Sequence, residues 1–275
     1  MTRLDAELVR RQLARSRAQA AELVRAGRVS ASGRVITKPS ATVTEEDNLA
    51  VAKVAGETEY ASRAAHKLLG ALEVLPEFRR RIAAANALDL GASTGGFTEV
   101  LLRNGAAHVI ALDVGHDQLL ARLRTDPRVT SLEGVNARDL SRTLIGASPA
   151  VVVGDLSFIS LRLVLGPLAA VADPQTVALL LVKPQFEVGR QRLGAGGVVR
   201  DPALHATAIR EVAAAAAEHG WQVEAVVPSP LPGPAGNREF FLALSRPPDG
   251  RACPLPGLEQ AILEAVTPLD AEVIP

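Results

Sequence analysis

The sequence predicts an α/β protein, in which a largely parallel sheet carries helices on both faces and a small α+β domain precedes it. From residue 86 onward, apolar strand-like segments alternate with helical patterns, which is the order that builds a parallel sheet. Hydrophobic residues make up 48% of the 275 residues, enough for a large core. We expect an N-terminal domain over 1–55, a linker over 56–62, a main domain over 63–245 and a C-terminal extension over 246–275.

The N-terminal segment reads as two short helices followed by a hairpin. Ser16 is a favourable N-cap for the second helix, and Gln19 three residues later completes a capping box. Gly27 stands where a glycine commonly ends a helix. The pair Ser32-Gly33 is a two-residue turn signal between alternating segments. A last strand is expected within 41–51, so this domain is α+β.

The N-terminal segment is also basic, although the whole chain has a net charge of zero. Residues 1–40 carry nine Lys and Arg against three Asp and Glu, a local balance of +6, so the remainder sums to −6. This asymmetry indicates an anionic partner, although a solvated basic face gives the same pattern. No aromatic residue precedes Tyr60, which favours contact with the backbone of folded RNA over base stacking. The candidate RNA-binding residues are Arg3, Arg10, Arg11, Arg15, Arg17, Arg25 and Arg28.

Composition also bears on the compartment and on metals. Cys253 is the one cysteine, so neither a disulfide framework nor a cysteine zinc site is expected. The five histidines show no metal-ligand spacing, and we expect no metal. The N-terminus is charged from Arg3 onward and lacks the apolar stretch of a signal peptide. The longest aliphatic runs, such as 177–182, are far too short to cross a bilayer. We expect a cytoplasmic protein.

The main domain contains seven strand-like segments. A helix near Ser62 leads into it, and further helices are expected over 95–105, 117–124 and 202–220. The last two strands form a terminal pair. The predicted strands lie within 86–92, 107–115, 128–134, 149–158, 176–186, 221–232 and 238–245.

A glycine-rich corner follows the first of these strands. Gly91, Gly95 and Gly96 allow a backbone to approach a ligand closely at a strand-to-helix turn, but Ser93 breaks the G-x-G-x-x-G fingerprint. Asp113 ends the second strand, where a carboxylate can accept the ribose hydroxyls of an adenosine cofactor. NAD is possible, and S-adenosylmethionine fits better because of what the other strand ends carry. The candidate cofactor residues are Gly91, Ser93, Gly95, Gly96, Phe97, Thr98 and Asp113, with Asn136 and Asp139 as adenine contacts or helix caps.

Charged side chains mark four other element ends beside strongly apolar segments. Asp155 and Lys183 follow the fourth and fifth strands, Lys67 lies on the entering helix, and Glu239 begins the last strand. Each alone is compatible with a surface or capping role. Because the carboxyl ends of parallel strands share one edge of the sheet, together they predict a catalytic cluster there.

In these motifs and in several others the chain resembles the TlyA family. Members of this family join an RNA-binding module named after ribosomal protein S-four to an FtsJ-like methyltransferase domain. The resemblance implies S-adenosylmethionine-dependent 2′-O-methylation of a ribosomal RNA ribose, at cytidine. It also implies a Lys-Asp-Lys-Glu catalytic tetrad, which falls on Lys67, Asp155, Lys183 and Glu239. Some members carry the name haemolysin, but no membrane-seeking segment supports pore formation here. The resemblance lies in "LVRAGRV", "SRAAHKL", "LDLGASTGGFT", "IALDVG", "GDLSFISL", "LVKPQFE", "GGVVRD" and "PSPLPGPAGNREF".

A ribose 2′-hydroxyl needs alignment and the loss of one proton to accept an activated methyl group. Our hypothesis makes Lys183 the base, oriented by Asp155, while Lys67 and Glu239 position the ribose. Phe158 and Phe186 follow the two catalytic strands and are either core residues or a platform for an extruded nucleotide.

Three other functions fit parts of the sequence. They are a small-molecule methyltransferase with an incidental N-terminal module, a non-catalytic RNA-binding or ribosome-assembly protein, and an NAD(P) oxidoreductase. The first would not need the basic N-terminal segment, the second would not need the tetrad, and the third would bind a nicotinamide cofactor.

Overall fold

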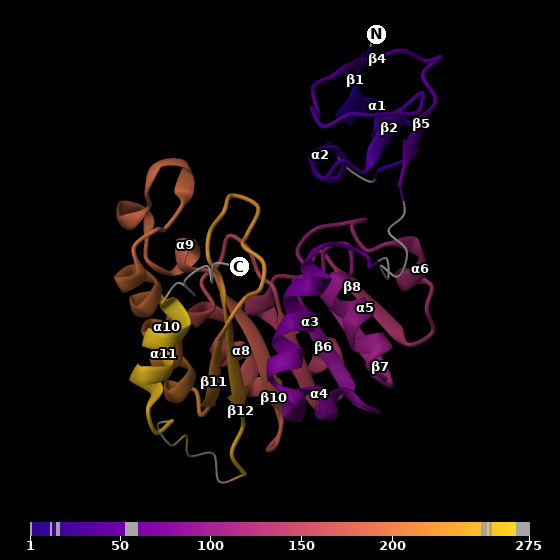
Figure 1. Cartoon of the computed structure of the whole chain (residues 1–275). Coiled ribbons are helices and arrows are strands. Elements are labelled where there is room, and N and C mark those ends of the chain that lie inside the picture. Colours follow the sequence, from indigo (N-terminus) through magenta and orange to yellow (C-terminus); the bar gives the residue numbers. More distant parts are fainter. Residues whose placement is uncertain are drawn as a thin grey trace. The chain divides into compact units, whose positions relative to one another are not determined.

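The computed structural model describes residues 2–11, 13–14, 17–52, 60–248, 252 and 255–267 of the chain (Figure 1). The chain divides into two compact units, residues 1–59 and 60–275.

The N-terminal unit has the predicted helix-helix-hairpin order. Its two helices bury Leu4, Leu8, Ala20 and Val24 against the strands. Ser32 and Gly33 both have positive φ angles, 49° and 83°, as a tight hairpin turn requires. The predicted capping residue Ser16 lies outside the described residues. The elements are β1 (Thr2–Arg3), α1 (Leu4–Arg10), α2 (Arg17–Arg25), β2 (Val29–Ala31), β3 (Arg34–Val35), β4 (Thr42–Val43) and β5 (Leu49–Val51). They form a sheet of order β3-β2-β5 and a β1-β4 pair.

The second unit is built on a seven-stranded sheet of order β11-β12-β10-β9-β6-β7-β8. Neighbouring strands from β10 to β8 pair in parallel, and β12 runs antiparallel to both β10 and β11. The predicted mostly parallel sheet and its terminal strand pair are therefore confirmed. The strands are β6 (Asn86–Leu90), β7 (His108–Asp113), β8 (Val129–Glu133), β9 (Val151–Gly154), β10 (Val177–Val182), β11 (Gln222–Pro228) and β12 (Phe240–Ser245).

Helices cover both faces of this sheet because successive strand residues point to opposite sides. One face packs against α3 (Ala64–Val74), α4 (Pro76–Ile82) and α5 (Gly96–Arg103). The other packs against α7 (Arg142–Ile145), α8 (Arg162–Val171), α10 (Pro202–Glu218) and α11 (Leu258–Val266). Three short elements, α6 (Ala121–Arg124), α9 (Pro184–Glu187) and η1 (Ala137–Asp139), lie in the connections.

The chain order reverses between β6 and β9. From β6 the chain runs outward to β7 and β8, and then crosses to the other side of β6 to form β9 and β10. Such a switch point opens a crevice beyond the carboxyl ends of the two strands, where ligands bind in open α/β sheets. Gly91 and Asp155, which directly follow β6 and β9, are thereby placed side by side.

Two segments differ from the sequence expectations or extend them. The helix expected over 117–124 is limited to α6, because Asp117 has a φ of 54° and its backbone N–H donates to the Glu133 carboxylate instead. The C-terminal helix α11 is part of the fold, since it buries Ile262, Ala265 and Val266 in the core beside α10 and β11. Among the described residues no helix is both long and apolar enough to span a bilayer.

Candidate active site

Four charged side chains from distant parts of the sequence meet at the carboxyl edge of the sheet. Nζ of Lys67 lies 2.7 Å from the Glu239 carboxylate and 3.4 Å from that of Asp155. Nζ of Lys183 lies 2.6 Å from the other oxygen of Asp155. Asp155 therefore bridges the two lysines. The predicted cluster is brought together, with all four side chains at least four-fifths buried.

Lys67 reaches this cluster because α3 is docked on the loop that precedes β12. One turn before Lys67, the Arg63 guanidinium donates to the carbonyl oxygen of Pro232. One turn after it, Gly70 faces Pro230, whose ring would lie 2.6 Å from any Cβ at that position. The spacing of 63, 67 and 70 places all three residues on one face of the helix. The loop that delivers Glu239 is thus held against α3 on both sides of the ion pair.

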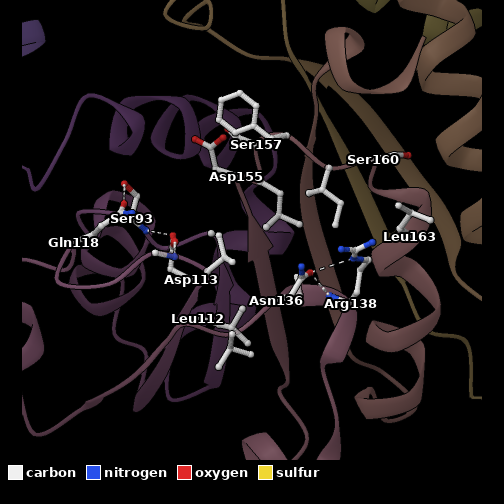
Figure 2. A pocket seen from close by; sticks show the side chains of 18 residues that line it. Ser93, Leu112, Asp113, Gln118, Asn136, Arg138, Asp155, Ser157, Ser160 and Leu163 are labelled. Atoms are coloured by element: carbon white, nitrogen blue, oxygen red, sulfur yellow. Dashed lines mark hydrogen bonds between the residues drawn. The ribbon is translucent and has the colours of Figure 1, made fainter. Parts of the chain in front are cut away.

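Asp155 also lines a pocket of about 640 Å³, within the size range of small-molecule sites. Figure 2 shows Asp113 with Ser93 and Gln118 in one part of this pocket, Asn136 and Arg138 in another, and Asp155 and Ser157 towards the top of the view. Both the glycine corner after β6 and the loop after β9 therefore open into the same cavity. The pocket lies at the switch point of the sheet.

Asp113 organises one end of the pocket. One of its carboxylate oxygens accepts a hydrogen bond from the backbone N–H of Ser93 at 2.7 Å, and the other accepts from that of Gly115 at 2.7 Å. The Ser93 hydroxyl in turn donates to the Gln118 side chain at 3.1 Å. A carboxylate has about four acceptor sites, so two bonds leave capacity for ligand hydroxyls. Its position at the end of β7 is the one predicted from the sequence.

Each of the two units contains a match to a known family. Residues 60–246 match the FtsJ-like methyltransferase family, and residues 2–49 match the S4 domain. The chain is 52% identical over 265 residues to the "16S/23S rRNA (cytidine-2'-O)-methyltransferase TlyA" of Mycobacterium tuberculosis, covering 96% of this chain and 97% of that protein.

This chain belongs to the TlyA family of FtsJ-like methyltransferases.

Other relatives of this family carry a different name. "Hemolysin A" of Brachyspira hyodysenteriae is 35% identical, with 87% of this chain and 98% of that protein covered. A solved structure described as a "putative hemolysin" of Streptococcus thermophilus superimposes with a TM-score of 0.76 at 36% identity, covering 96% of this chain and 94% of that one. The region that superimposes therefore includes residues of both units of this chain.

Membership of this family confirms that S-adenosylmethionine is the cofactor, and the pocket fits it. A Cβ at Gly91, whose φ is 82°, would lie 2.9 Å from the backbone oxygen of Asp155, so only glycine leaves the turn after β6 this close to β9. Gly91, Ser93, Asp113 and Asn136 all line the pocket, as expected for cofactor contacts. Asn136 also caps η1 by accepting from the backbone N–H of Arg138 at 3.0 Å, as one of its two predicted roles requires, while its contact with adenine stays a prediction.

Five other candidate cofactor residues do not line this pocket. Gly95 and Gly96 make room for neighbours, since a Cβ at either would lie within 2.5 Å of Leu123 or Ser62. Phe97 is buried against Phe241, and Asp139 lies exposed in η1. Thr98 is fully buried and donates to the Asp89 carboxylate at 2.6 Å. In this chain Gly95, Gly96, Phe97 and Thr98 thus pack α5 against its surroundings.

Three polar residues of the pocket were not predicted from the sequence. Ser157 accepts a hydrogen bond from Lys183 at 2.7 Å, and Gln118 and Arg138 contribute polar groups to the wall. Ser157 and Arg138 lie one or two positions from residues already identified, and only this closeness could have signalled them. Gln118 lies in the segment expected to be helical, five positions after Asp113, and nothing in the sequence marks it as a pocket residue.

Asp89 lies in β6 beneath the corner and is completely buried. Burial raises its pKa to about 7, and the nearby Asp155 charge adds to the shift, while the Thr98 hydrogen bond opposes it. Its second oxygen has no hydrogen-bond partner among the described residues. Near neutral pH this carboxyl therefore carries a proton in a substantial fraction of molecules, directly behind the site.

Four of the predicted RNA-binding arginines form ion pairs with buried carboxylates within the S4 domain. Arg3 and Arg17 pair with the buried Asp5, and Arg10 and Arg11 pair with the buried Glu7. The hydrogen bond from Arg3 contributes most to lowering the pKa of Asp5, and those from Arg10 and Arg11 lower the pKa of Glu7 to about 2.

Six of the seven predicted arginines lie among the described residues, and they differ in how far their side chains are exposed. Arg11 also donates to the backbone oxygens of Asp47, Thr44 and Glu45, which gives it a structural role. Arg28 is partly buried and donates to the Ala52 oxygen, whereas Arg25 is exposed. Arg3, Arg10 and Arg17 remain more than half exposed and keep donors for phosphate. The seventh, Arg15, lies outside the described residues.

Within the described ranges, no group of three or more His, Cys, Asp or Glu side chains is placed to hold a metal ion.

Proposed function

We propose that this protein transfers a methyl group from S-adenosylmethionine to the 2′-hydroxyl of a cytidine ribose in ribosomal RNA. One observation carries the proposal: Lys67, Lys183 and Glu239 gather around Asp155, and Asp155 lines the cofactor pocket. The 52% identical relative is named for this activity. Ribosomal subunits are the proposed form of the substrate, and the cytoplasm, where ribosomes work, is the proposed site of action.

When bound, S-adenosylmethionine supplies a methyl group that is already activated by its sulfonium. The residues of this chain then need to align the ribose and accept one proton. In our proposal the amine of Lys183 takes the proton of the 2′-hydroxyl, so that this oxygen could accept the methyl group while the bond from that methyl to sulfur breaks and the donor leaves as a neutral thioether. Asp155 and Ser157, at 2.6 and 2.7 Å from Nζ of Lys183, hold this amine in place. General base catalysis of this kind contributes about 10²–10⁴-fold to the rate.

Lys67 and Glu239 are assigned to binding the ribose. Their mutual ion pair at 2.7 Å and the 3.4 Å contact of Lys67 with Asp155 hold the Lys67 ammonium beside the group that orients the base. A fixed positive charge there stabilises negative charge that develops on the ribose oxygen, without any rearrangement during the reaction. Lys67 therefore acts on the oxygen, and Glu239 keeps Lys67 in position.

The target nucleotide must leave its stack for its 2′-hydroxyl to reach this site. Phe158 suits this task, because its ring is 91% exposed at the pocket lining and lies 5.3 Å from the ring of Phe186. A large exposed aromatic ring on a pocket rim provides a platform for a base. The exposed arginines of the N-terminal unit are proposed to contact phosphates elsewhere on the rRNA.

The experiment that tests this function is transfer of labelled methyl from S-adenosylmethionine to small subunits, large subunits and naked rRNA, followed by mass-spectrometric mapping of the modified nucleotide. We expect a 2′-O-methylcytidine that is absent when Lys183→Ala is used. The exposed variant Arg142→Ala, remote from the tetrad, serves as the matched control and should retain the activity. Methylation of a base, or of no RNA substrate, would overturn the proposal, and so would activity that survives deletion of residues 1–55.

A further inference from the structure

Residues 155–161 form the loop that follows β9. Both ends of this loop are bonded to residues 183–187, the short segment that contains α9. At its start, Lys183 contacts Asp155 at 2.6 Å and the Ser157 hydroxyl at 2.7 Å. At its far end, the Glu187 carboxylate accepts from the Ser160 hydroxyl at 2.5 Å and from the Leu161 backbone N–H at 2.8 Å. The contacts of Lys183 belong to the tetrad. The contacts of Glu187 play no part in the proposed transfer of the methyl group.

Glu187 is unusual for a purely structural contact, because its ionisable side chain is only 1% exposed. Burial raises the pKa of this carboxyl, while the bonds from Ser160 and Leu161 act in the opposite direction. Arg162 adds a contact 3.5 Å from the carboxylate and also pairs with Glu211 at 3.1 Å. A buried carboxylate is costly unless its oxygens are occupied, and here they are occupied by the end of the 155–161 loop.

The loop needs such an attachment because its middle is strained. Phe158 has a φ of 64°, a left-handed backbone conformation that side-chain-bearing residues rarely adopt. Its ring is almost fully exposed, so packing alone does not impose this conformation, although Phe186 touches it. Strain of this kind persists where the surroundings determine the backbone on both sides.

We propose that Glu187 is a positioning residue, which fixes the 155–161 loop and thereby sets the placement of Asp155, Ser157 and Phe158 around Lys183. The inference rests on the proposed function for its kinetic consequence but not for its structural one. Glu187→Ala removes both acceptors from the end of the loop. Glu187→Gln keeps an acceptor for the Leu161 N–H and offers its amide to the Ser160 hydroxyl, which accepts it.

The test compares Glu187→Ala, Glu187→Gln and the control Glu211→Ala, which removes the other partner of Arg162. Single-turnover transfer to rRNA, the dissociation constant of S-adenosylmethionine and thermal unfolding are measured for each. We expect Glu187→Ala to slow transfer by about 10- to 100-fold, since misplacement by about 1 Å has effects of this size. Its cofactor affinity should change by less than the rate, Glu187→Gln should restore most of the rate, and Glu211→Ala should match the parent protein.

A substrate-independent readout separates this inference from the proposed function. The six phenylalanines are labelled with 4-fluorophenylalanine, and the Phe158 signal in the ¹⁹F spectrum is assigned with Phe158→Leu. We expect this signal to shift or broaden in Glu187→Ala and to return in Glu187→Gln, whether or not rRNA is methylated. If Glu187→Ala does not fold, Ser160→Ala removes one of the two bonds and should give a smaller change of the same kind. An unchanged Phe158 signal, or a Glu187→Ala variant with the parent rate, would overturn the proposal.

Discussion

Lys67 and Glu239 are separated by 172 residues in the sequence, and their side chains form an ion pair at 2.7 Å. The exposed fractions of the two side chains are 5% and 1%. A pair so well removed from water is costly to separate, because removing one partner leaves the other as an isolated buried charge. This pair therefore joins the first helix of the catalytic unit to its last strand, and it supports the site as well as belonging to it.

The first prediction concerns the stability of the second unit. Lys67→Met leaves the Glu239 carboxylate buried without its cation, and we expect it to lower the free energy of unfolding by about 3–5 kcal/mol. Glu239→Gln should cost less, because Lys67 keeps its contact with Asp155. Thermal and urea unfolding measure both. Glu77→Gln, at an 83% exposed side chain, is the matched control. Equal stability of Lys67→Met and Glu77→Gln would contradict the prediction.

The convergence of the tetrad was predictable from the sequence because each member adjoins a long apolar segment. Asp155 and Lys183 follow the buried runs of β9 and β10, and parallel strands end at one edge. The seven strands and their terminal pair were predictable for the same reason, since apolar runs bounded by turns mark buried strands.

Contacts that depend on which neighbour packs where were not predictable. The pattern at Gly95 and Gly96 is that of a ligand-binding turn, yet these glycines accommodate Leu123 and Ser62. Likewise, nothing in the sequence indicates that Asp5 and Glu7 are buried and pair with the arginines predicted to bind RNA. Periodicity shows which face of an element is buried, but not which polar partner meets it.

The second prediction isolates the proposed base. Lys183→Ala should abolish methyl transfer, a loss of at least about 10²-fold, because no other amine is bonded to both Asp155 and Ser157 in the described part of the chain. Lys183 is not among the residues that line the pocket, so S-adenosylmethionine affinity measured by calorimetry should be nearly unchanged. A Lys183→Ala enzyme that still methylates rRNA at neutral pH would show that the proton is taken elsewhere.

The third prediction concerns the cofactor end of the pocket. The two carboxylate oxygens of Asp113 accept from the backbone N–H groups of Ser93 and Gly115. Asp113→Asn removes the negative charge and replaces one of these oxygens by an NH₂ group, which cannot accept. Hydrogen bonds to charged groups contribute about 1.5–3 kcal/mol, so we expect S-adenosylmethionine to bind about 10- to 100-fold more weakly. The transfer rate at saturating cofactor should be largely retained. Asp117→Asn, in the same loop with a 90% exposed side chain, should bind as the parent does, and equal affinities of the two variants would refute this role for Asp113.

The fourth prediction is a dependence of stability on pH through Asp89. The pKa of Asp89 is about 7 in the folded state and near 4 in the unfolded state, so the folded state binds the proton more tightly. The resulting contribution to stability is fully present below about pH 4. This stabilisation is lost as the pH rises from about 4 to 7. Asp89→Asn cannot ionise, and its stability should therefore fall less between pH 5 and pH 8, by about 2–4 kcal/mol relative to the parent. If the melting temperatures of the two proteins change equally with pH across this range, the pKa of Asp89 is not raised.

The fifth prediction separates nucleotide binding from chemistry at Phe158. Stacking of a base on an aromatic ring contributes about 1–3 kcal/mol, so Phe158→Leu should raise the KM for rRNA by about 5- to 100-fold. Cofactor affinity and unfolding should change little, because the ring is 91% exposed and supports little of the core. Phe158→Tyr keeps the aromatic face and should behave as the parent does. If Tyr and Leu are equally impaired, the ring does not act by stacking; if both retain the parent KM, the extruded nucleotide is held by other residues of the pocket rim.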